Sequence, residues 1–300
     1  MKLVGLMPVR NEAWCLGFTL RVALRWCDEV VVCDHGCTDE SRAIMEELAK
    51  TSGVVVREDR EQEWNEMQQR NMLLTECRLR GATHIALIDA DEFATANLVD
   101  GPIREYVGRL HPGTMMELPL YNVRDCGGVA RDVFGLHYHS NGVWGNRLVA
   151  TAFQDSPVLH WAGDRFHHRE PFGCGWNRKS PVSQSYGGSL HLWGASERRL
   201  RAKHALYRIT ERLRFPNKPS RDVEYTYDPA TNPDSQLAKD LRLAGPWTFA
   251  QVKPEWIEPY ADLMQYLDID AEPWQEAEVR LLLETHGREK FSGLDLLGVE

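Results

Sequence analysis

The chain has 300 residues, of which 43% are hydrophobic and 26% charged, and its formal net charge at pH 7 is -9. This composition is typical of a soluble globular protein and excludes collagen-like, coiled-coil and disordered classes. The excess of carboxylates argues against a protein that coats nucleic acid through bulk charge, so no nucleic-acid partner is expected. No apolar run approaches the roughly 20 residues that span a bilayer, and we predict no transmembrane segment.

The cysteines indicate a reducing compartment. Seven are present, an odd number without the spacing of a secreted disulfide scaffold or of a zinc ribbon. We therefore expect free thiols in a cytoplasmic protein, either unattached or peripheral at the inner face of the membrane.

Strand and helix patterns alternate from the first residues onward. Continuous β-branched runs predict buried strands, and apolar residues spaced three and four apart predict helices. The expected strands cover residues 3–7, 29–33, 53–56 and 84–88, and the expected helices cover about 16–27, 39–49 and 62–80. Short links between them imply right-handed crossovers, and hence an α/β fold with a mainly parallel central sheet.

The pattern changes after about residue 112. Short alternating runs between residues 113 and 160 predict antiparallel strands, and a basic helix is expected over 196–214. Residues 216–300 read as a polar linker followed by short helices.

Polar residues follow three of the expected strands. These clusters are Arg10-Asn11-Glu12, Asp34-His35-Gly36 and Asp89-Ala90-Asp91. Because ligands of parallel sheets bind outside the carboxyl ends of the strands, the three clusters predict one ligand site.

Each cluster has a functional and a structural interpretation. Asp89 and Asp91 could share Mg²⁺ or Mn²⁺ and so neutralise a nucleotide diphosphate, or they could form a solvated acidic turn. Asp34 could accept a hydrogen bond from a nucleobase N–H, or cap the next turn. Arg70 could pair with Asp34 or reach a phosphate, or be a plain surface arginine.

Several nucleotide-binding and hydrolase motifs are absent. No G-x-G-x-x-G follows the first strand, and neither a P-loop nor a G-x-S-x-G elbow occurs in the chain. A dinucleotide fold, a P-loop ATPase and an α/β-hydrolase are therefore not supported.

Taken in order, residues 7–12, 31–39 and 87–93 resemble family 2 glycosyltransferases of the GT-A fold. The resemblance covers about residues 1–215, with a nucleotide-binding half over 1–112 and an acceptor half over 113–215, and it leaves 216–300 as the linker and helical extension. Cys37 stands where the family commonly has Ser. The resemblance implies that Asp91 ligates the metal and that Asp89 lies near the ribose, and Asp89 is also a candidate metal ligand. The donor-binding candidates are Pro8, Arg10, Asn11, Glu12, Asp34, Arg70, Asp89 and Ala90.

Residues 146–148, 161–165 and 189–193 also resemble a bacterial branch of the family, and this resemblance adds two candidate residues. His191 would be a third metal ligand, with a packed core histidine as the alternative. Lys203, on the basic helix that follows, would contact the donor.

The acceptor side requires a base that takes the proton of the attacking hydroxyl. By position Asp164 is the first candidate, with Glu170 and His168 as alternatives. A surface salt bridge in a loop explains Asp164 equally well.

The resemblance thus implies a metal-dependent transfer of a hexosyl or related group. The donor is a nucleotide-diphosphate sugar, with UDP favoured, and the acceptor is a hydroxyl of a glycan or another molecule. Two alternatives stay open, a sugar-1-phosphate nucleotidyltransferase and a non-catalytic nucleotide-sugar binding module.

Overall fold

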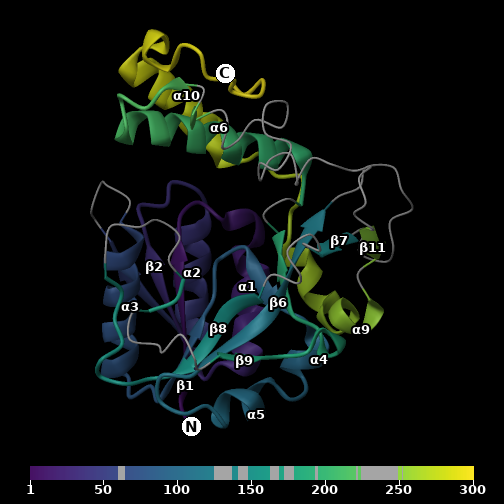
Figure 1. The fold of residues 1–300 in the computed structure, drawn as a ribbon. Helices are drawn as coiled ribbons and strands as arrows, with labels where there is room; N and C mark the ends of the chain where they lie inside the picture. Colours follow the sequence, from purple (N-terminus) through teal and green to yellow (C-terminus); the bar gives the residue numbers. More distant parts are fainter. Residues whose placement is uncertain are drawn as a thin grey trace. The chain divides into compact units, whose positions relative to one another are not determined.

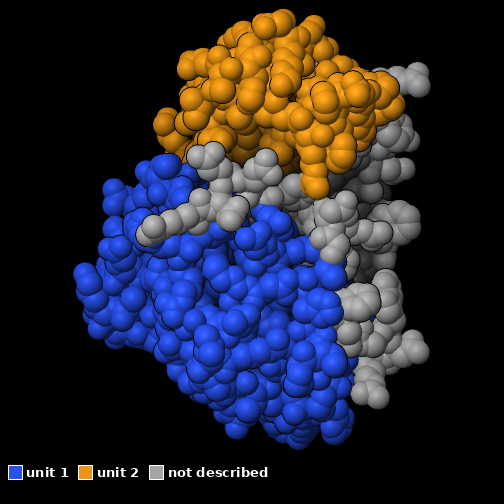
Figure 2. All heavy atoms as spheres, turned by 90° about the vertical axis from the view of Figure 1, so that its left-hand side faces the viewer, with its two compact units in different colours: residues 1–121, 140–191, 252–268 blue, residues 122–139, 192–251, 269–300 orange. Residues whose placement is uncertain are grey.

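The computed structural model describes residues 1–59, 65–124, 137–140, 148–162, 169–171, 179–192, 195–220, 222–223, 249–251 and 253–300. The chain forms two compact units, coloured blue and orange in Figure 2. The first contains residues 1–121, 140–191 and 252–268, and the second contains residues 122–139, 192–251 and 269–300. The domain boundary predicted at residue 215 stays a prediction.

The first unit alternates strands and helices in the expected order (Figure 1). Its strands are β1 (Leu3–Val9), β2 (Glu29–Asp34), β3 (Val54–Glu58), β4 (His84–Leu87), β5 (Glu92–Ala94), β6 (Met115–Arg124), β8 (Leu148–Gln154), β9 (Lys179–Pro181) and β10 (Ser189–His191). Its helices are α1 (Ala13–Trp26), α2 (Ser41–Thr51), α3 (Glu66–Leu79), α4 (Ala96–Val99), α5 (Ile103–Gly108), α9 (Pro254–Ile257) and the 3-10 helices η2 (Gln184–Tyr186) and η4 (Glu258–Tyr266).

The sheet of the first unit has the strand order β3-β2-β1-β4-β8-β6. β1 pairs in parallel with β2 and β4, and β2 pairs in parallel with β3. β8 runs antiparallel to both β4 and β6. The predicted α/β fold with a mainly parallel sheet is therefore confirmed, as is the antiparallel pairing expected after residue 112.

The order of the strands creates a switch point. β2 and β3 extend from one side of β1, whereas β4 lies on its other side. The connections therefore run in opposite directions from β1. Sheets of this kind bind their ligands in a crevice outside the carboxyl ends of the strands at such a point, here those of β1 and β4.

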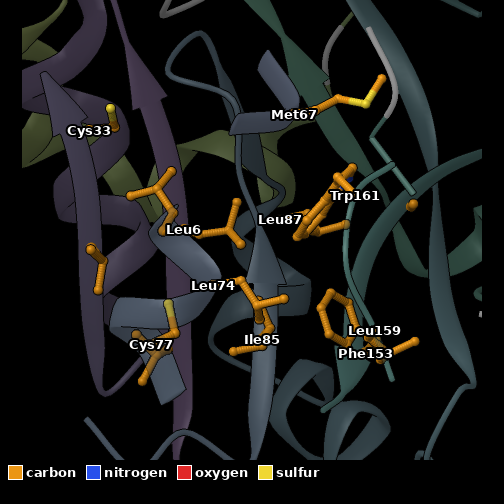
Figure 3. Packing of buried hydrophobic residues seen from close by; sticks show 14 of the residues in the cluster. Leu6, Cys33, Met67, Leu74, Cys77, Ile85, Leu87, Phe153, Leu159 and Trp161 are labelled. Carbon is orange, nitrogen blue, oxygen red and sulfur yellow. The ribbon is translucent and has the colours of Figure 1, made fainter. Parts of the chain in front are cut away.

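The core explains why β1 is apolar throughout. Leu6 of β1 and Ile85 and Leu87 of β4 pack with Leu74 and Cys77 of α3 in one buried cluster (Figure 3). Alternate residues of a strand face opposite sides of the sheet, so the intervening residues of β1 face away from α3. Both faces are buried, and no polar position is left in the middle of the strand.

The first two helices begin at a shared carboxylate. Asp39 accepts hydrogen bonds from the backbone N–H of Ala13 at 3.0 Å and of Ser41 at 2.9 Å. These groups belong to the first residues of α1 and α2, which have no partners within their helices. Asp39 therefore satisfies one backbone N–H at the start of each helix.

Part of the chain beyond residue 215 belongs to the first unit. The Tyr260 hydroxyl in η4 donates to the carbonyl of Ala94 at 2.9 Å, and the rings of Phe18, Phe93 and Tyr260 contact one another edge to face. The Arg21 guanidinium lies 3.6 Å from the centre of the Tyr266 ring. Residues expected to form an extension thus cover α1 and β5.

The second unit is mainly helical. Its described elements are β7 (His137–Ser140), α6 (Glu197–Arg214), β11 (Phe249–Gln251), α10 (Trp274–His286) and the 3-10 helix η5 (Arg288–Phe291). Ala205 and Ile209 of α6 pack against Val279 and Leu283 of α10, and the side chain of Ser196 caps α6. The basic helix expected over 196–214 is confirmed, and none of the described helices is long and apolar enough to cross a membrane.

Candidate active site

The three polar clusters predicted from sequence lie at the switch point of the sheet. Asp34 is the last residue of β2, Arg10 directly follows β1, and Asp89 comes two residues after β4 ends. Because β1 pairs with both other strands in parallel, these ends lie at the same edge.

Asn11 joins the loop after β1 to the loop after β2. Its φ of 54° is in the left-handed region, which asparagine adopts more readily than most residues. Its side-chain oxygen accepts from the backbone N–H of Thr38 at 2.7 Å and of Asp39 at 3.4 Å. The side chain of Asn11 therefore holds the backbone of the second loop.

Asp34 is buried, with 2% of its surface exposed, and it caps the turn that follows it. One carboxylate oxygen accepts from the backbone N–H of Cys37 at 2.8 Å, and the other lies 3.7 Å from a guanidinium nitrogen of Arg42. The structural interpretation of Asp34 is thus realised, and its contact with a nucleobase stays a prediction.

Cys37 takes the place of the serine common in the resembling family. Its sulfur accepts from the Asn11 backbone N–H at 3.4 Å and lies 3.6 Å from the Val9 carbonyl oxygen. Burial raises the pKa of Cys37 to about 12, so the thiol stays neutral at pH 7. A neutral thiol can donate and accept as a hydroxyl does, although more weakly.

The other residues of the first cluster have structural contacts as well. The Glu12 carbonyl accepts the first hydrogen bonds of α1, and its carboxylate accepts from the Trp14 indole N–H at 2.5 Å. Pro8 lies within β1 and Arg10 directly after it. Burial, and then the charge of Arg10, lower the pKa of the neighbouring His35, although Asp59 opposes this. The donor-binding roles of Pro8, Arg10 and Glu12 stay predictions.

The turn after β4 is held by two arginines. Arg70 donates to one carboxylate oxygen of Asp89 at 3.0 Å, and Arg169 donates to the other at 3.1 Å. The carbonyl of Ala90 accepts from Thr19 on α1 at 2.8 Å. Burial alone would raise the pKa of Asp89, but the two guanidinium groups outweigh it and hold that pKa below its ordinary value.

Two of the proposed interpretations of Arg70 are wrong. Arg70 pairs with Asp89 and with Glu66, at 3.0 and 2.8 Å, and not with Asp34. Only 2% of its surface is exposed, so it is not a surface residue either. The reason is that α3 packs against β1, which brings Arg70 to the end of β4 rather than to that of β2.

Asp91 and His191 are neighbours although 100 residues separate them. The Nε2 atom of His191 lies 3.5 Å from a carboxylate oxygen of Asp91. This proximity follows from strand pairing, because β10 runs antiparallel to β5 with His191 opposite Glu92. A carboxylate and an imidazole at this distance suit Mn²⁺ or Mg²⁺ that completes its shell with phosphate oxygens and water.

Asp89 fits a metal less well than Asp91. Both of its oxygens already accept from guanidinium groups, and a cation would compete with them. Among the described residues, no three His, Cys, Asp or Glu side chains converge into a ready-made metal site. The pair of Asp91 and His191 would therefore need the ligand itself to complete the coordination.

Of the three candidate bases on the acceptor side, the structure describes only Glu170. Glu170 accepts from Lys179 at 3.0 Å, and the same ammonium donates to the buried Glu117 at 2.5 Å. Asp164 and His168 lie outside the described residues. Lys203 lies on α6, in the second unit, and is buried. Its role as a donor contact stays a prediction.

Sequence reasoning missed Arg169. Its guanidinium donates to Glu92 at 2.6 Å, to Asp89 at 3.1 Å and to the carbonyl of Leu87 at 2.6 Å. The only signal in the sequence is that Arg169 directly precedes the candidate base Glu170. An arginine in a loop gives no pattern that identifies its partners about 80 residues earlier.

Comparison with known proteins gives one family match. Residues 6–106 match the model described as "Glycosyl transferase family 2", which spans all three clusters. The predicted family resemblance is therefore confirmed over these residues. No curated protein matches the chain.

Solved structures with a similar fold include S. aureus TarS 1-349, at 15% identity and a TM-score of 0.42, with 98% of this chain and 89% of that chain covered. The same TarS segment in complex with UDP-GlcNAc gives 13% identity and a TM-score of 0.44, with the same coverage. Glucosyl-3-phosphoglycerate synthase from Mycobacterium tuberculosis, in complex with Mn²⁺, UDP and glucosyl-3-phosphoglycerate, gives 18% identity and a TM-score of 0.26, with 42% of this chain and 44% of that chain covered.

Proposed function

We propose, from the match of residues 6–106 to glycosyl transferase family 2, that this protein is a metal-assisted glycosyltransferase. It moves a sugar from a nucleotide-diphosphate sugar, with UDP-sugars favoured, to a hydroxyl of a glycan or another acceptor. The observation that carries the proposal is the pair of Asp91 and His191, which lies beside the ion-paired Asp89 at the end of β4.

The nucleoside occupies the side of the crevice formed by the ends of β1 and β2. Asp34 is fixed there by its own capping bond, and its second oxygen is the acceptor offered to a base N–H. Asn11 and Cys37 keep the two loops together, so the pocket is formed before the ligand binds.

The diphosphate occupies the side formed by the end of β4. Asp91 and His191 would hold Mn²⁺ or Mg²⁺, which, when bound, neutralises the diphosphate as it leaves the sugar. Asp89 has 35% of its side chain exposed and is oriented by Arg70 and Arg169, which suits a hydrogen bond to the ribose rather than metal ligation.

The base is a carboxylate or a histidine on the acceptor side. Glu170 is the candidate that the structure describes, and its ion pair with Lys179 fixes its position. Asp164 and His168 remain the alternatives. In each case the residue takes the proton of the attacking hydroxyl.

A panel of nucleotide diphosphates with and without Mn²⁺ tests the proposal. UDP with Mn²⁺ should stabilise the protein by about 2.7 kcal/mol at a hundredfold excess over Kd, and it should do so more than UDP alone. UDP-sugars should then release UDP in a Mn²⁺-dependent reaction.

Three outcomes would replace the proposal. Pyrophosphate release from a nucleoside triphosphate and a sugar 1-phosphate would show a nucleotidyltransferase. Tight donor binding without any turnover would show a binding module, and stabilisation by none of the nucleotides would exclude the donor site altogether.

A further inference from the structure

Arg169 contacts the two sheet strands and the turn that surround the proposed metal pair. Its Nη2 atom donates to the Leu87 carbonyl, at the end of β4, at 2.6 Å, and its Nε atom donates to the Ala150 carbonyl on β8 at 2.7 Å. Its Nη1 atom donates to Glu92 at 2.6 Å and to Asp89 at 3.1 Å. All three guanidinium nitrogens are thus used, and 13% of the side chain is exposed.

The charges of the turn explain why a cation is needed here. Asp89, Asp91 and Glu92 are three carboxylates within four residues. Glu92 is the most deeply buried of them, with 4% of its surface exposed, and it pairs with Arg169. Without that guanidinium, a buried carboxylate would lose its counter-charge and repel its two neighbours.

The strand pairing extends this effect to His191. Glu92 begins β5, and it lies directly opposite His191 of β10. Because Arg169 holds the side chain of Glu92, it also holds the end of β5 that pairs with β10. This is the position at which Asp91 lies next to His191.

We propose that Arg169 is a positioning residue of the donor site: it holds the turn of residues 89–92 in one conformation, so that Asp91 stays beside His191. This positioning role, called the lock below, depends only on the contacts above. Its consequence for metal and nucleotide binding rests on the proposed function.

Arg78 provides a matched control in the same unit. It donates twice to Asp155, at 2.9 Å each, and once each to the carbonyls of Ser156 and Leu159, at 2.8 and 2.9 Å. Asp155 bonds to the backbone of Thr83, which precedes β4, so Arg78 acts at the opposite end of that strand. Its number of bonds equals that of Arg169, but it does not touch the turn.

The variants are Arg169→Gln, Arg169→Lys, the double variant Arg169→Gln with Glu92→Gln, and Arg78→Gln. Hydrogen exchange of the unliganded proteins reports on the backbone amides of residues 88–95. We expect exchange in this segment to become about tenfold faster in Arg169→Gln and to be unchanged in Arg78→Gln.

Calorimetry with UDP and Mn²⁺ gives the functional readout. Loss of a residue that orients metal ligands typically weakens metal affinity about 10- to 100-fold, and we expect this range for Arg169→Gln. The double variant removes the unpaired buried charge and should recover melting temperature without recovering affinity. Arg169→Lys keeps the charge but cannot reach all four acceptors, so it should recover affinity only in part.

The inference is overturned if exchange in residues 88–95 is unchanged in Arg169→Gln, or if its affinity falls no more than that of Arg78→Gln. Should Arg169→Gln not fold, the lysine and double variants decide by the same two measurements. Absence of UDP binding by the wild type would contradict the proposed function alone, because the exchange result still tests the lock.

Discussion

The two sides of the candidate site are held by different forces. Where β1 and β2 end, Asn11 and Asp34 accept hydrogen bonds from backbone N–H groups of residues 37–39, which directly follow β2. Where β4 ends, the carboxylates of Asp89 and Glu92 are held by the side chains of Arg70 and Arg169.

The difference follows from charge density. A single buried carboxylate needs little compensation, and at Asp34 one backbone N–H of its own turn and the more distant guanidinium of Arg42 supply it. Three carboxylates within four residues repel one another, and neutral donors cannot cancel that repulsion. The β4 side therefore depends on cations from distant parts of the chain, and its variants should have larger effects than those on the β1–β2 side.

The largest effect is expected from Arg70→Gln. It leaves the buried Glu66 and one oxygen of the half-buried Asp89 without a counter-charge, which should lower the free energy of unfolding by about 3 kcal/mol or more. Urea denaturation measures this. Arg109→Gln is the control, because its ion pair with Glu105 is exposed on both sides and worth about 1 kcal/mol at most. Equal losses in the two variants would contradict the comparison.

Asp91→Ala should abolish transfer while the protein stays folded. Removing a metal ligand at a strand end costs transition-state stabilisation, about 100-fold or more in rate, but disturbs no core group. Activity with a UDP-sugar and circular dichroism give the two readouts. Asp262→Ala, which removes an exposed carboxylate paired with Arg25, should retain full activity. Full turnover by a folded Asp91→Ala protein would refute the metal assignment.

On the β1–β2 side, Asp34→Ala should weaken UDP binding by about 1.5 to 3 kcal/mol, the contribution of one charge-assisted hydrogen bond. Calorimetry measures the change. Asp34→Asn keeps an oxygen for the Cys37 N–H and so separates loss of charge from loss of the cap. A wild type that prefers adenine or guanine diphosphates would show that this pocket is wrongly assigned.

His191→Ala should raise the Mn²⁺ concentration needed for activity about tenfold, with little change in the melting temperature of the unliganded protein. A histidine that only packs in the core would behave in the opposite way, because its loss leaves a cavity. Titration of Mn²⁺ together with thermal unfolding distinguishes the two. An unchanged metal requirement with a large fall in melting temperature would establish the packing role.

The smallest effect is a dependence of stability on pH through His35. Burial, the largest influence, lowers the pKa of His35 below its ordinary 6.5 in the folded protein. As the pH falls below 6.5, the unfolded chain takes up a proton that the folded chain does not, so the free energy of unfolding decreases. Urea denaturation at pH 7.5 and 5.5 should show this decrease in the wild type and a smaller one in His35→Gln. An equal decrease in both would assign the proton uptake to other groups.

On the β1–β2 side, the strand ends and the cap formed by Asp34 could be predicted from sequence, because they depend on residues within a few positions. The bonds from Asn11 to the loop after β2 could not, because they join residues 27 and 28 positions apart. The positions of Asp89 and Asp91 were predicted because both residues closely follow a buried strand. Arg70 was predicted as a functional residue, but with the wrong partner, since its helix crosses the sheet before it reaches β4.

The sequence by itself therefore determined the alternation of strands and helices, the edge of the sheet at which the three polar clusters lie and the family to which residues 6–106 are matched. Only the tertiary structure decided which charges meet there. Arg169 reaches Glu92 from 77 residues further along the chain, and Arg70 pairs with Asp89 rather than with Asp34. His191 was expected beside Asp91 from the family resemblance, and the pairing of β10 with β5 is what brings the two together. Periodicity and capping are encoded over one or two turns of chain, whereas an ion pair forms between whichever side chains the packed strands bring within a few ångströms.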